Sequence, residues 1–262
     1  MAKKILKVLV IGDTHDSPEI VDKSRFGWFA KHIKKTKPDV VVQIGDFVTL
    51  DSCTHFIRDD TYTARIEKPI FMKDMESMDL AMKEFDDNLK DFKIKKYITL
   101  GNHEKRMFRK EDSNPTFYGM CQKEFFSNCK KYDWEVIPCG KYLMLDGVGF
   151  IHAPINAMGK EYGGEASERM IANKSKIDIV FGHSHRAQDN RVSKISPIQN
   201  DFTRIVNVGC SMPHNHIENY AKHSLTGWTY QICELTIWDN HINEVNNISM
   251  ETLEREYGKK KH

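Results

Sequence analysis

Short apolar runs that stop at a glycine recur along the chain, and they predict buried β-strands. The runs cover residues 5–11, 40–44, 96–100 and 177–181, and the glycines that end them are Gly12, Gly45, Gly101 and Gly182. Runs of this length between turn residues are typical of strands covered on both faces of a sheet. We therefore expect at least four strands in the interior of the protein.

Segments with apolar residues three and four positions apart separate these runs and predict amphipathic helices. The helices are expected over residues 18–35, 69–91, 115–129 and 165–173. Further strands are expected over 134–138 and 142–152, as a meander with a turn at Asp146-Gly147, and over 204–208, 228–238 and 242–248. The order of strand, helix and strand indicates an α/β fold with a parallel sheet and right-handed crossovers.

The chain reads as one domain followed by a short tail. Its 262 residues suffice for a single large α/β domain, which we place at residues 1–250. Residues 47–95 form an insertion, irregular at first and then helical, that is expected to line the site. Residues 251–262 are predicted to be a charged C-terminal tail.

The composition narrows the class of protein without naming a partner. Hydrophobic residues make up 40% of the chain, and 39 basic residues nearly balance 37 acidic ones. The charge therefore leaves a nucleic-acid partner open and says nothing about oligomeric state. The six cysteines form no C-x-x-C pair, and the sequence has neither a signal-peptide core nor an apolar run of about 20 residues. We expect a cytoplasmic protein with free thiols and no membrane contact.

Metal-seeking side chains follow the strand-ending glycines. The motifs in order are Asp13-Thr14-His15, Gly45-Asp46, Gly101-Asn102-His103-Glu104, His152 and Gly182-His183-Ser184-His185. In open α/β sheets, ligands bind beyond the carboxyl ends of the strands. We therefore expect these side chains to meet at one edge of the sheet.

The number of donors favours two metal ions. Seven side chains offer oxygen or nitrogen atoms: Asp13, His15, Asp46, Asn102, His152, His183 and His185. One tetrahedral ion needs only four ligands, so we expect two divalent ions with one carboxylate as a bridge. The mixed donor set suits manganese first, with iron, zinc, cobalt or nickel as alternatives. Such a pair attracts phosphate oxygens and generates a metal-bound hydroxide, which predicts hydrolysis of phosphate esters.

Two residues near Asn102 are candidates for acting on the substrate. His103 is not needed as a ligand and is predicted to protonate the departing alkoxide as a general acid. If Glu104 starts a helix, Arg106 shares a face with His103 and is placed to bind a phosphate oxygen, with Asn102 as a further substrate contact. The alternative for Arg106 is a solvated helix residue.

The order and the flanks of these motifs resemble those of the calcineurin-like metallophosphoesterase superfamily. Its pattern is D-x-H, G-D, G-N-H-(E/D), H and G-H-x-H, and the matching positions span residues 13–185. The resemblance implies a four-layer β-sandwich flanked by helices, with the metal site at the C-terminal ends of the strands. By motif, Asp13, His15 and His185 resemble the first metal's ligands, and Asn102, His152 and His183 resemble the second metal's ligands. Asp46 resembles the bridge, and His103 resembles the leaving-group acid.

One departure from the pattern bears on the substrate. Protein phosphatases of the superfamily extend the second motif to G-D-x-x-D-R-G, but here Thr49 stands at the acidic position and no arginine follows. The chain is more similar to small microbial and phage-type phosphoesterases. This favours phosphodiesters, including nucleic acids. The alternatives are a phosphomonoesterase acting on nucleotides, small molecules or phosphoproteins, and a binding scaffold without catalysis.

Structural roles compete with several of these assignments. Asp13 and Asp46 could cap helices, and His152 could be a buried core histidine. A second H-x-H pair, His214 and His216, is expected to belong to a loop, because the ligand set is already complete.

Overall fold

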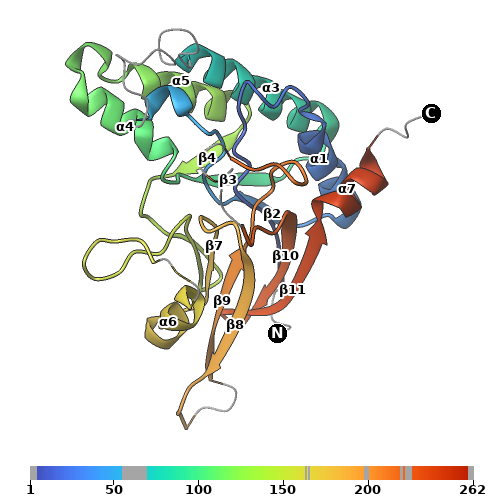
Figure 1. Ribbon diagram of the computed structural model, residues 1–262. Coiled ribbons are helices and arrows are strands. Elements are labelled where there is room, and N and C mark those ends of the chain that lie inside the picture. Colours follow the sequence, from blue (N-terminus) through green and yellow to red (C-terminus); the bar gives the residue numbers. More distant parts are fainter. Residues whose placement is uncertain are drawn as a thin grey trace.

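Two β-sheets pack face to face in the protein, and helices cover their outer faces (Figure 1). This arrangement is seen in a computed structural model that describes residues 5–54, 70–162, 164, 166–197, 201–218, 221 and 226–258. Residues 55–69 of the predicted insertion and residues 259–262 of the predicted tail lie outside the described part.

The first sheet has six strands in the order β11-β10-β1-β2-β3-β4. Their bounds are β1 Leu6–Ile11, β2 Val40–Gln43, β3 Lys95–Thr99, β4 Trp134–Ile137, β10 Gln231–Trp238 and β11 His241–Ser249. Strands β1 to β4 run parallel, as the strand–helix–strand order predicts, and β10 pairs antiparallel with β1. All four parallel strands therefore end at the same edge.

The second sheet has five strands in the order β5-β6-β7-β9-β8. Their bounds are β5 Leu143–Leu145, β6 Val148–Phe150, β7 Ile179–Phe181, β8 Ala187–Ser193 and β9 Phe202–Val208. Strands β6, β7 and β9 are parallel, and β5 and β8 pair antiparallel at the two edges. Isolated bridges from Cys210 to Asp13 and to Tyr230 connect the end of β9 with the first sheet.

Helices cover the outer face of each sheet. They are α1 Ser24–Thr36, α3 Phe71–Leu89, α4 Glu104–Ser113, α5 Met120–Lys131, α6 Ser167–Lys174 and α7 Met250–Tyr257, with 3-10 turns η1 Asp51–Cys53 and η2 Pro115–Phe117. Helix α6 lies on the second sheet, and the other helices lie on the side of the first sheet (Figure 1).

The apolar runs are explained by burial on both faces. In β1, Leu9 and Ile11 belong to the core between the first sheet and its helices, whereas Val8 and Val10 belong to the core between the two sheets. A strand in this position needs apolar side chains at every position rather than at alternate ones. The predicted α/β class with a two-sheet, four-layer arrangement is confirmed.

The predicted meander is wrong. Strand β4 joins β3 in the first sheet, whereas β5 and β6 belong to the second sheet. The turn between β5 and β6 is as predicted, because Asp146 and Gly147 both have positive φ, at 43° and 78°, as a two-residue hairpin turn requires. Strand β8 was not predicted, because its sequence has no apolar stripe.

The segment predicted as a charged tail begins with a helix. Ser249 caps α7 by accepting a hydrogen bond from the backbone N–H of Thr252. Met250 and Leu253, three positions apart, are buried at 1% and 0% exposure, and Tyr257 packs against the same core. The charged residues of the segment occupy the other face, so its composition alone concealed an amphipathic helix.

Candidate metal centre

The structure brings all seven predicted ligands to one region between the two sheets. Each follows a strand of the central parallel arrangement: Asp13 and His15 follow β1, Asp46 follows β2, Asn102 follows β3, His152 follows β6, and His183 and His185 follow β7. Their donor atoms form two adjoining groups. We call Asp13, His15 and His185 site A, and Asn102, His152 and His183 site B, with Asp46 between them.

The donor atoms of site A converge on a single point. His185 Nε2 lies 3.1 Å from Asp13 Oδ2 and 3.0 Å from His15 Nε2. Two ring nitrogens that face each other this closely in a buried site suit a shared cation. Donor atoms about 2.1 Å from one ion and at right angles to each other lie about 3.0 Å apart. Asp13 Oδ1 and His15 Nδ1 are buried without a hydrogen-bond partner, which a folded protein rarely leaves without a function.

Site B has the same close spacing. Asn102 Oδ1 lies 3.0 Å from His152 Nε2 and 2.8 Å from His183 Nδ1. The other ring nitrogen of His152, Nδ1, lies 3.0 Å from the carbonyl oxygen of Ile44, to which it donates. That hydrogen bond fixes the tautomer whose Nε2 lone pair points into site B, as in a metal-binding histidine.

Asp46 lies between the two sites. Its Oδ2 atom is 3.8 Å from His15 Nε2 in site A and 3.2 Å from His152 Nε2 in site B. Its other oxygen, Oδ1, accepts a hydrogen bond from the backbone N–H of His103 at 2.8 Å. One carboxylate oxygen thus faces both sites while the other is held in place, which is the arrangement a bridging ligand needs.

Two glycines leave room for the carboxylates. A Cβ on Gly101 would lie 2.1 Å from Asp46 Oδ1, and a Cβ on Gly182 would lie 2.2 Å from Asp13 Oδ1. Any larger residue at either position would displace a candidate ligand. Neither glycine has a positive φ, so glycine is required at these two positions by the site rather than by the backbone conformation.

The backbone at the ligands is strained. Positive φ angles occur at His15 (41°), Asp46 (49°), His183 (69°) and His185 (57°). Left-handed conformations of non-glycine residues typically cost about 1–3 kcal/mol each and persist where the surrounding structure enforces them. The chain bears this cost at four of the seven ligand positions, which supports selection for the position of these side chains rather than for stability.

The electrostatics of the centre suit a bound cation. Burial alone would raise the pKa of Asp46, but His152, His103 and His15 together hold it well below its usual value. Burial opposes protonation of His152, but Asp46 and Asp13 outweigh it and raise the pKa of His152 to about 10. Burial and then His103 and His185 lower the pKa of His15. The proton on His152 occupies a place where two carboxylates favour positive charge, and a metal ion competes with protons for such a place.

His103 and Arg106 form a connected pair beside Asp46. His103 Nδ1 donates to the carbonyl oxygen of Thr49 at 2.7 Å, and its Nε2 accepts from Arg106 Nη2 at 3.0 Å, since a guanidinium can only donate. Arg106 also donates to Thr49 O and to Asp51 Oδ1. Arg106 is thus a hydrogen-bond partner of His103 rather than a solvated residue. Burial lowers the pKa of His103; Asp46 acts to raise this pKa, and Arg106 acts to lower it further.

Sequence reasoning missed two acidic residues at the centre. The buried carboxylate of Glu104 accepts hydrogen bonds from the backbone N–H groups of Asp46 (2.9 Å), Phe47 (2.8 Å) and Gly101 (2.8 Å), and so holds two ligand loops together. Burial, with Asp46 adding to it, raises the pKa of Glu104 to about 7. Glu161 lies 3.5 Å from His183 Nε2. Glu104 ends the third motif, which was the available signal, whereas nothing around Glu161 pointed to it.

The second H-x-H pair lies outside both sites. His214 pairs with Glu251 at 3.1 Å, and His216 pairs with Glu218 at 3.3 Å.

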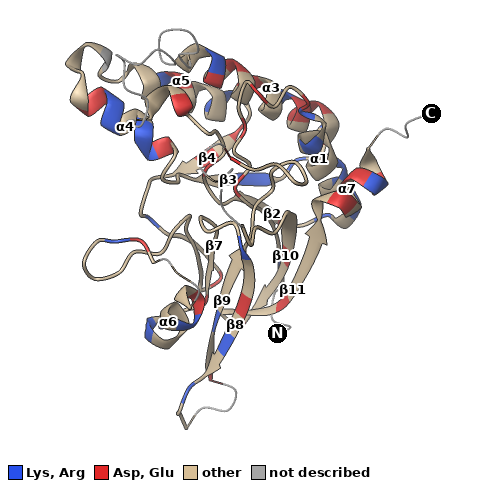
Figure 2. Ribbon diagram, viewed as in Figure 1, with Lys and Arg blue, Asp and Glu red and all other residues tan. Residues whose placement is uncertain are grey.

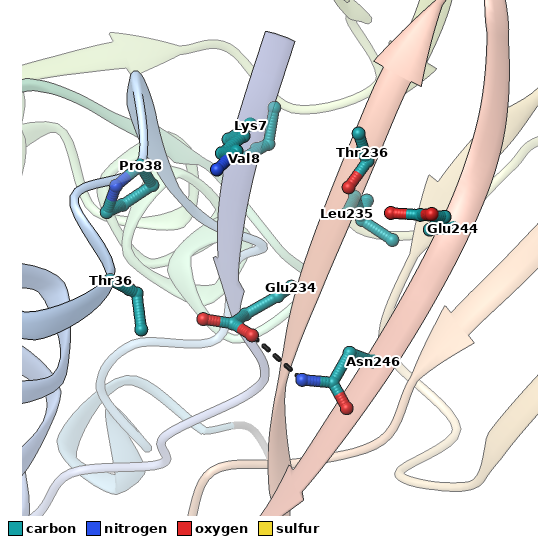
Figure 3. Close-up of a pocket in the computed structure, with 9 residues that line it drawn as sticks. All are labelled: Lys7, Val8, Thr36, Pro38, Glu234, Leu235, Thr236, Glu244 and Asn246. Atoms are coloured by element: carbon teal, nitrogen blue, oxygen red, sulfur yellow. Dashed lines mark hydrogen bonds between the residues drawn. The ribbon is translucent and has the colours of Figure 1, made fainter. Parts of the chain in front are cut away.

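A separate hollow of about 430 Å³ involves Lys7, Glu234 and Glu244 (Figure 3). It is lined by the part of β1 farther from Asp13, so it is not part of the candidate centre.

Comparison with known proteins identifies the family. The Metallophos family, calcineurin-like phosphoesterase, matches residues 6–187. The chain belongs to this family. It is therefore a metallophosphoesterase, a metal-dependent hydrolase of phosphate esters, and the resemblance seen in the motifs is confirmed. The comparison with curated proteins found no match. Within the described residues of this metallophosphoesterase, no helix is both long and apolar enough to span a membrane.

Several solved structures are distantly similar to the chain. A conserved protein from Streptococcus pneumoniae TIGR4, a predicted phosphoesterase, is 13% identical over 95% of this chain and 92% of its own, with a TM-score of 0.40. Yfce, a phosphoesterase from E. coli, is 12% identical over 93% and 100%, with a TM-score of 0.38. Vps29 from Entamoeba histolytica, complexed with zinc, is 11% identical over 94% and 99%, with a TM-score of 0.36.

Proposed function

We propose that this metallophosphoesterase hydrolyses phosphodiesters with a dinuclear centre. The observation that carries the proposal is the position of Asp46 Oδ2, which faces His15 Nε2 of site A at 3.8 Å and His152 Nε2 of site B at 3.2 Å. A single carboxylate oxygen placed between two groups of converging donors suits a bridge between two divalent ions. Manganese is the proposed metal, because nitrogen and oxygen donors are mixed and thiolates do not contribute.

The residues present fit such a pair of ions. Site A supplies one carboxylate and two imidazoles, and site B supplies one amide oxygen and two imidazoles. When bound, two divalent ions held by these residues would supply charge neutralisation for the phosphate and activation of water. The chain's own contribution is to fix the donors, through the hydrogen bond from His152 to Ile44 O and the backbone hydrogen bonds to Glu104.

His103 is proposed to protonate the leaving oxygen, and Arg106 to bind a phosphoryl oxygen. In the structure the two side chains are hydrogen-bonded to each other, because Arg106 Nη2 donates to His103 Nε2. A phosphoryl oxygen beside them would offer Arg106 a charged acceptor and leave His103 Nε2 free to carry a proton. The amide nitrogen of Asn102 is the remaining proposed substrate contact, because its Oδ1 already faces His152 and His183.

Two carboxylates beside the centre favour diesters over monoesters. Asp51 lies 3.2 Å from Arg106 Nη1, and Glu161 lies 3.5 Å from His183 Nε2. A phosphodiester carries one negative charge, whereas a monoester carries up to two near neutral pH and is repelled more strongly by such neighbours. A nucleic-acid strand is one diester that meets this requirement.

Two further expectations belong to the proposal. Ligands come from both sheets, which supports residues 1–250 acting as one domain, with the start of the 47–95 insertion bordering the site through Thr49 and Asp51. The six cysteine thiols are free, which supports a reducing compartment such as the cytoplasm.

The test combines metals, substrates and variants. Purified protein would be assayed with manganese, nickel, zinc and magnesium against bis(p-nitrophenyl) phosphate and p-nitrophenyl phosphate. We expect faster hydrolysis of the diester; faster hydrolysis of the monoester would show a phosphomonoesterase instead. Asp46→Asn should abolish turnover and bind fewer than two metal ions per chain. An Asp46→Asn variant with full activity would exclude Asp46 as a bridging ligand.

A second variant separates acid catalysis from metal binding. His103→Asn should lower turnover by about 10²–10⁴-fold while the metal content stays at the wild-type level, since general acids typically contribute this much. Loss of metal in His103→Asn would show that it is a ligand. The matched control is His214→Asn, a histidine paired with Glu251 outside the two sites, which should change neither quantity.

A further inference from the structure

Two adjoining hollows extend from site B toward helices α4 and α5. The first, which we call the polar pocket, has a volume of about 160 Å³. It is lined by Leu100, Gly101, Asn102, Lys105, Cys139, Gly140, His152, Ala153, Ile155 and Glu161. The second, the apolar pocket, has a volume of about 510 Å³ and is lined by Leu100, Lys105, Phe108, Phe126, Val136, Pro138 and Cys139. Because Leu100, Lys105 and Cys139 line both, the two hollows share a wall.

The apolar pocket is built from three elements. Phe108 comes from α4, Phe126 from α5 and Val136 from β4, and Pro138 follows that strand. The rings of Phe108 and Phe126 lie 6.4 Å apart between centroids and are tilted by 48°. Both rings are only partly buried. Two partly exposed aromatic rings beside aliphatic side chains favour an aromatic guest, because rings attract one another in tilted and offset geometries beyond simple burial.

The charge at the shared wall suits a phosphate ester. Lys105 lines both pockets and begins a basic stretch of α4 that also holds Arg106, Arg109 and Lys110 (Figure 2). A long lysine side chain can place its methylenes against an apolar group and its ammonium near an anion. The wall between the pockets therefore suits the junction between a charged phosphate and an apolar substituent.

The pockets border site B, whereas the proposed acid lies beside site A, since the ring centroids of His103 and His15 are 4.4 Å apart. Asn102 and His152 of site B line the polar pocket, but His103 lines neither hollow. The group that leaves must lie near His103, so the pockets are placed for the other ester group, which stays on phosphorus.

We propose that the apolar pocket binds the aromatic ring of the retained ester group, so that the substrates are phosphodiesters with an aryl or nucleobase-bearing substituent. The inference rests on the proposed diesterase function and names its substrate class. The volume of about 510 Å³ lies within the range of small-molecule sites and accommodates one or two fused rings.

The test keeps the leaving group constant and varies the retained group. Phenyl p-nitrophenyl phosphate and methyl p-nitrophenyl phosphate both release p-nitrophenolate, so a difference in kcat/KM reports on the retained group alone. We expect the wild-type protein to prefer the phenyl ester by at least about tenfold, the scale of a good apolar contact. Phe108→Ala and Phe126→Ala should each lower kcat/KM for the phenyl ester by about tenfold and change that for the methyl ester less than twofold.

The matched control is Phe92→Ala, another partly buried phenylalanine, which lines neither pocket and should change neither ester. Binding of phenyl methylphosphonate and methyl methylphosphonate, measured by calorimetry, gives a readout without turnover, and the phenyl compound should bind about tenfold more tightly. If Phe126→Ala does not fold, the wild-type preference and Phe108→Leu still decide the question.

The outcomes separate the two proposals. Hydrolysis of both esters at equal rates, with equal affinity for both phosphonates, would overturn the pocket assignment and leave the diesterase function standing. No hydrolysis of either ester by metal-loaded protein that does cleave p-nitrophenyl phosphate would overturn the diesterase function, and the pocket assignment with it.

Discussion

Replacing Gly101 by alanine is expected to disable the centre through a single methyl group. The new Cβ would lie 2.1 Å from Asp46 Oδ1 and 2.8 Å from the Asp46 backbone nitrogen, whereas ordinary contacts begin at about 3.4 Å. The carboxylate oxygen must therefore retreat by about 1.3 Å, the difference between 3.4 Å and 2.1 Å. That oxygen is also held by the backbone N–H of His103, so the movement breaks a hydrogen bond and turns the proposed bridge.

The size of the effect follows from the required precision. Catalytic groups must be held within about 0.5 Å, and a displacement of about 1 Å typically costs about 10²-fold in rate. We therefore expect Gly101→Ala to lower kcat/KM by about 100-fold, or about 2.7 kcal/mol of transition-state stabilisation. Gly101 does not have a positive φ, so alanine fits its backbone conformation and the effect arises from the contact alone.

The assay measures kcat/KM and bound metal per chain in parallel. Gly182→Ala should act in the same way on site A, because its Cβ would lie 2.2 Å from Asp13 Oδ1. Gly227→Ala is the control, since the nearest atom to its Cβ is 4.0 Å away. A Gly101→Ala protein with two bound ions and wild-type kcat/KM would refute the assignment of Asp46 as a precisely held bridge.

Three other perturbations have defined outcomes. Burial raises the pKa of Asp74 to about 6 in the folded protein against 3.8 for the free side chain, so the folded state keeps this proton longer and stability falls as pH rises from about 4 through about 6. The unfolding free energy of Asp74→Asn, measured relative to wild type in urea titrations, should therefore increase by about 1.4 kcal/mol between pH 5 and pH 8. If the difference between variant and wild type stays the same at all pH values, the raised pKa of Asp74 is contradicted. Glu104→Gln presents one acceptor oxygen to three backbone N–H groups, so the variant should lose about 2 kcal/mol or more of unfolding free energy in the same assay. A stability near that of the wild type would contradict the role of Glu104 in holding the two ligand loops together. Manganese at 100 times its Kd should add about 2.7 kcal/mol of stability to the metal-free protein, measured as a rise in Tm, and this rise should shrink in Asp46→Asn.

The sequence was sufficient to predict which residues meet, because strand ends carry positional information. Asp13, Asp46 and Asn102 each follow a glycine at the end of a buried parallel strand, and parallel strands end at one edge. The neighbouring position of Arg106 and His103 on one helix face was also predictable from their spacing, and the structure joins them by a hydrogen bond. Local rules were enough in these cases because the contacts follow directly from strand and helix geometry.

Features that depend on tertiary context could not be predicted in this way. Strand β4 pairs with β3 and not with β5, and short strands carry no mark of their partner in their own sequence. The positive φ angles at His15 and His185 are imposed by the surrounding fold against the residues' own preference. Glu161 reaches His183 from a loop distant in sequence, and no spacing rule connects the two.

The position of β10 has a consequence for when the enzyme can first act. This strand lies beside β1 and pairs with it along its whole length, from Leu6 opposite Ile237 to Ile11 opposite Ile232. A ribosome makes the first strand more than two hundred residues before it makes this neighbour, so β1 emerges with one edge unpaired. The loop that carries Asp13 and His15 therefore lacks its neighbour on one side until β10 has been made, and we expect a nascent chain that ends before β10 to have no phosphoesterase activity.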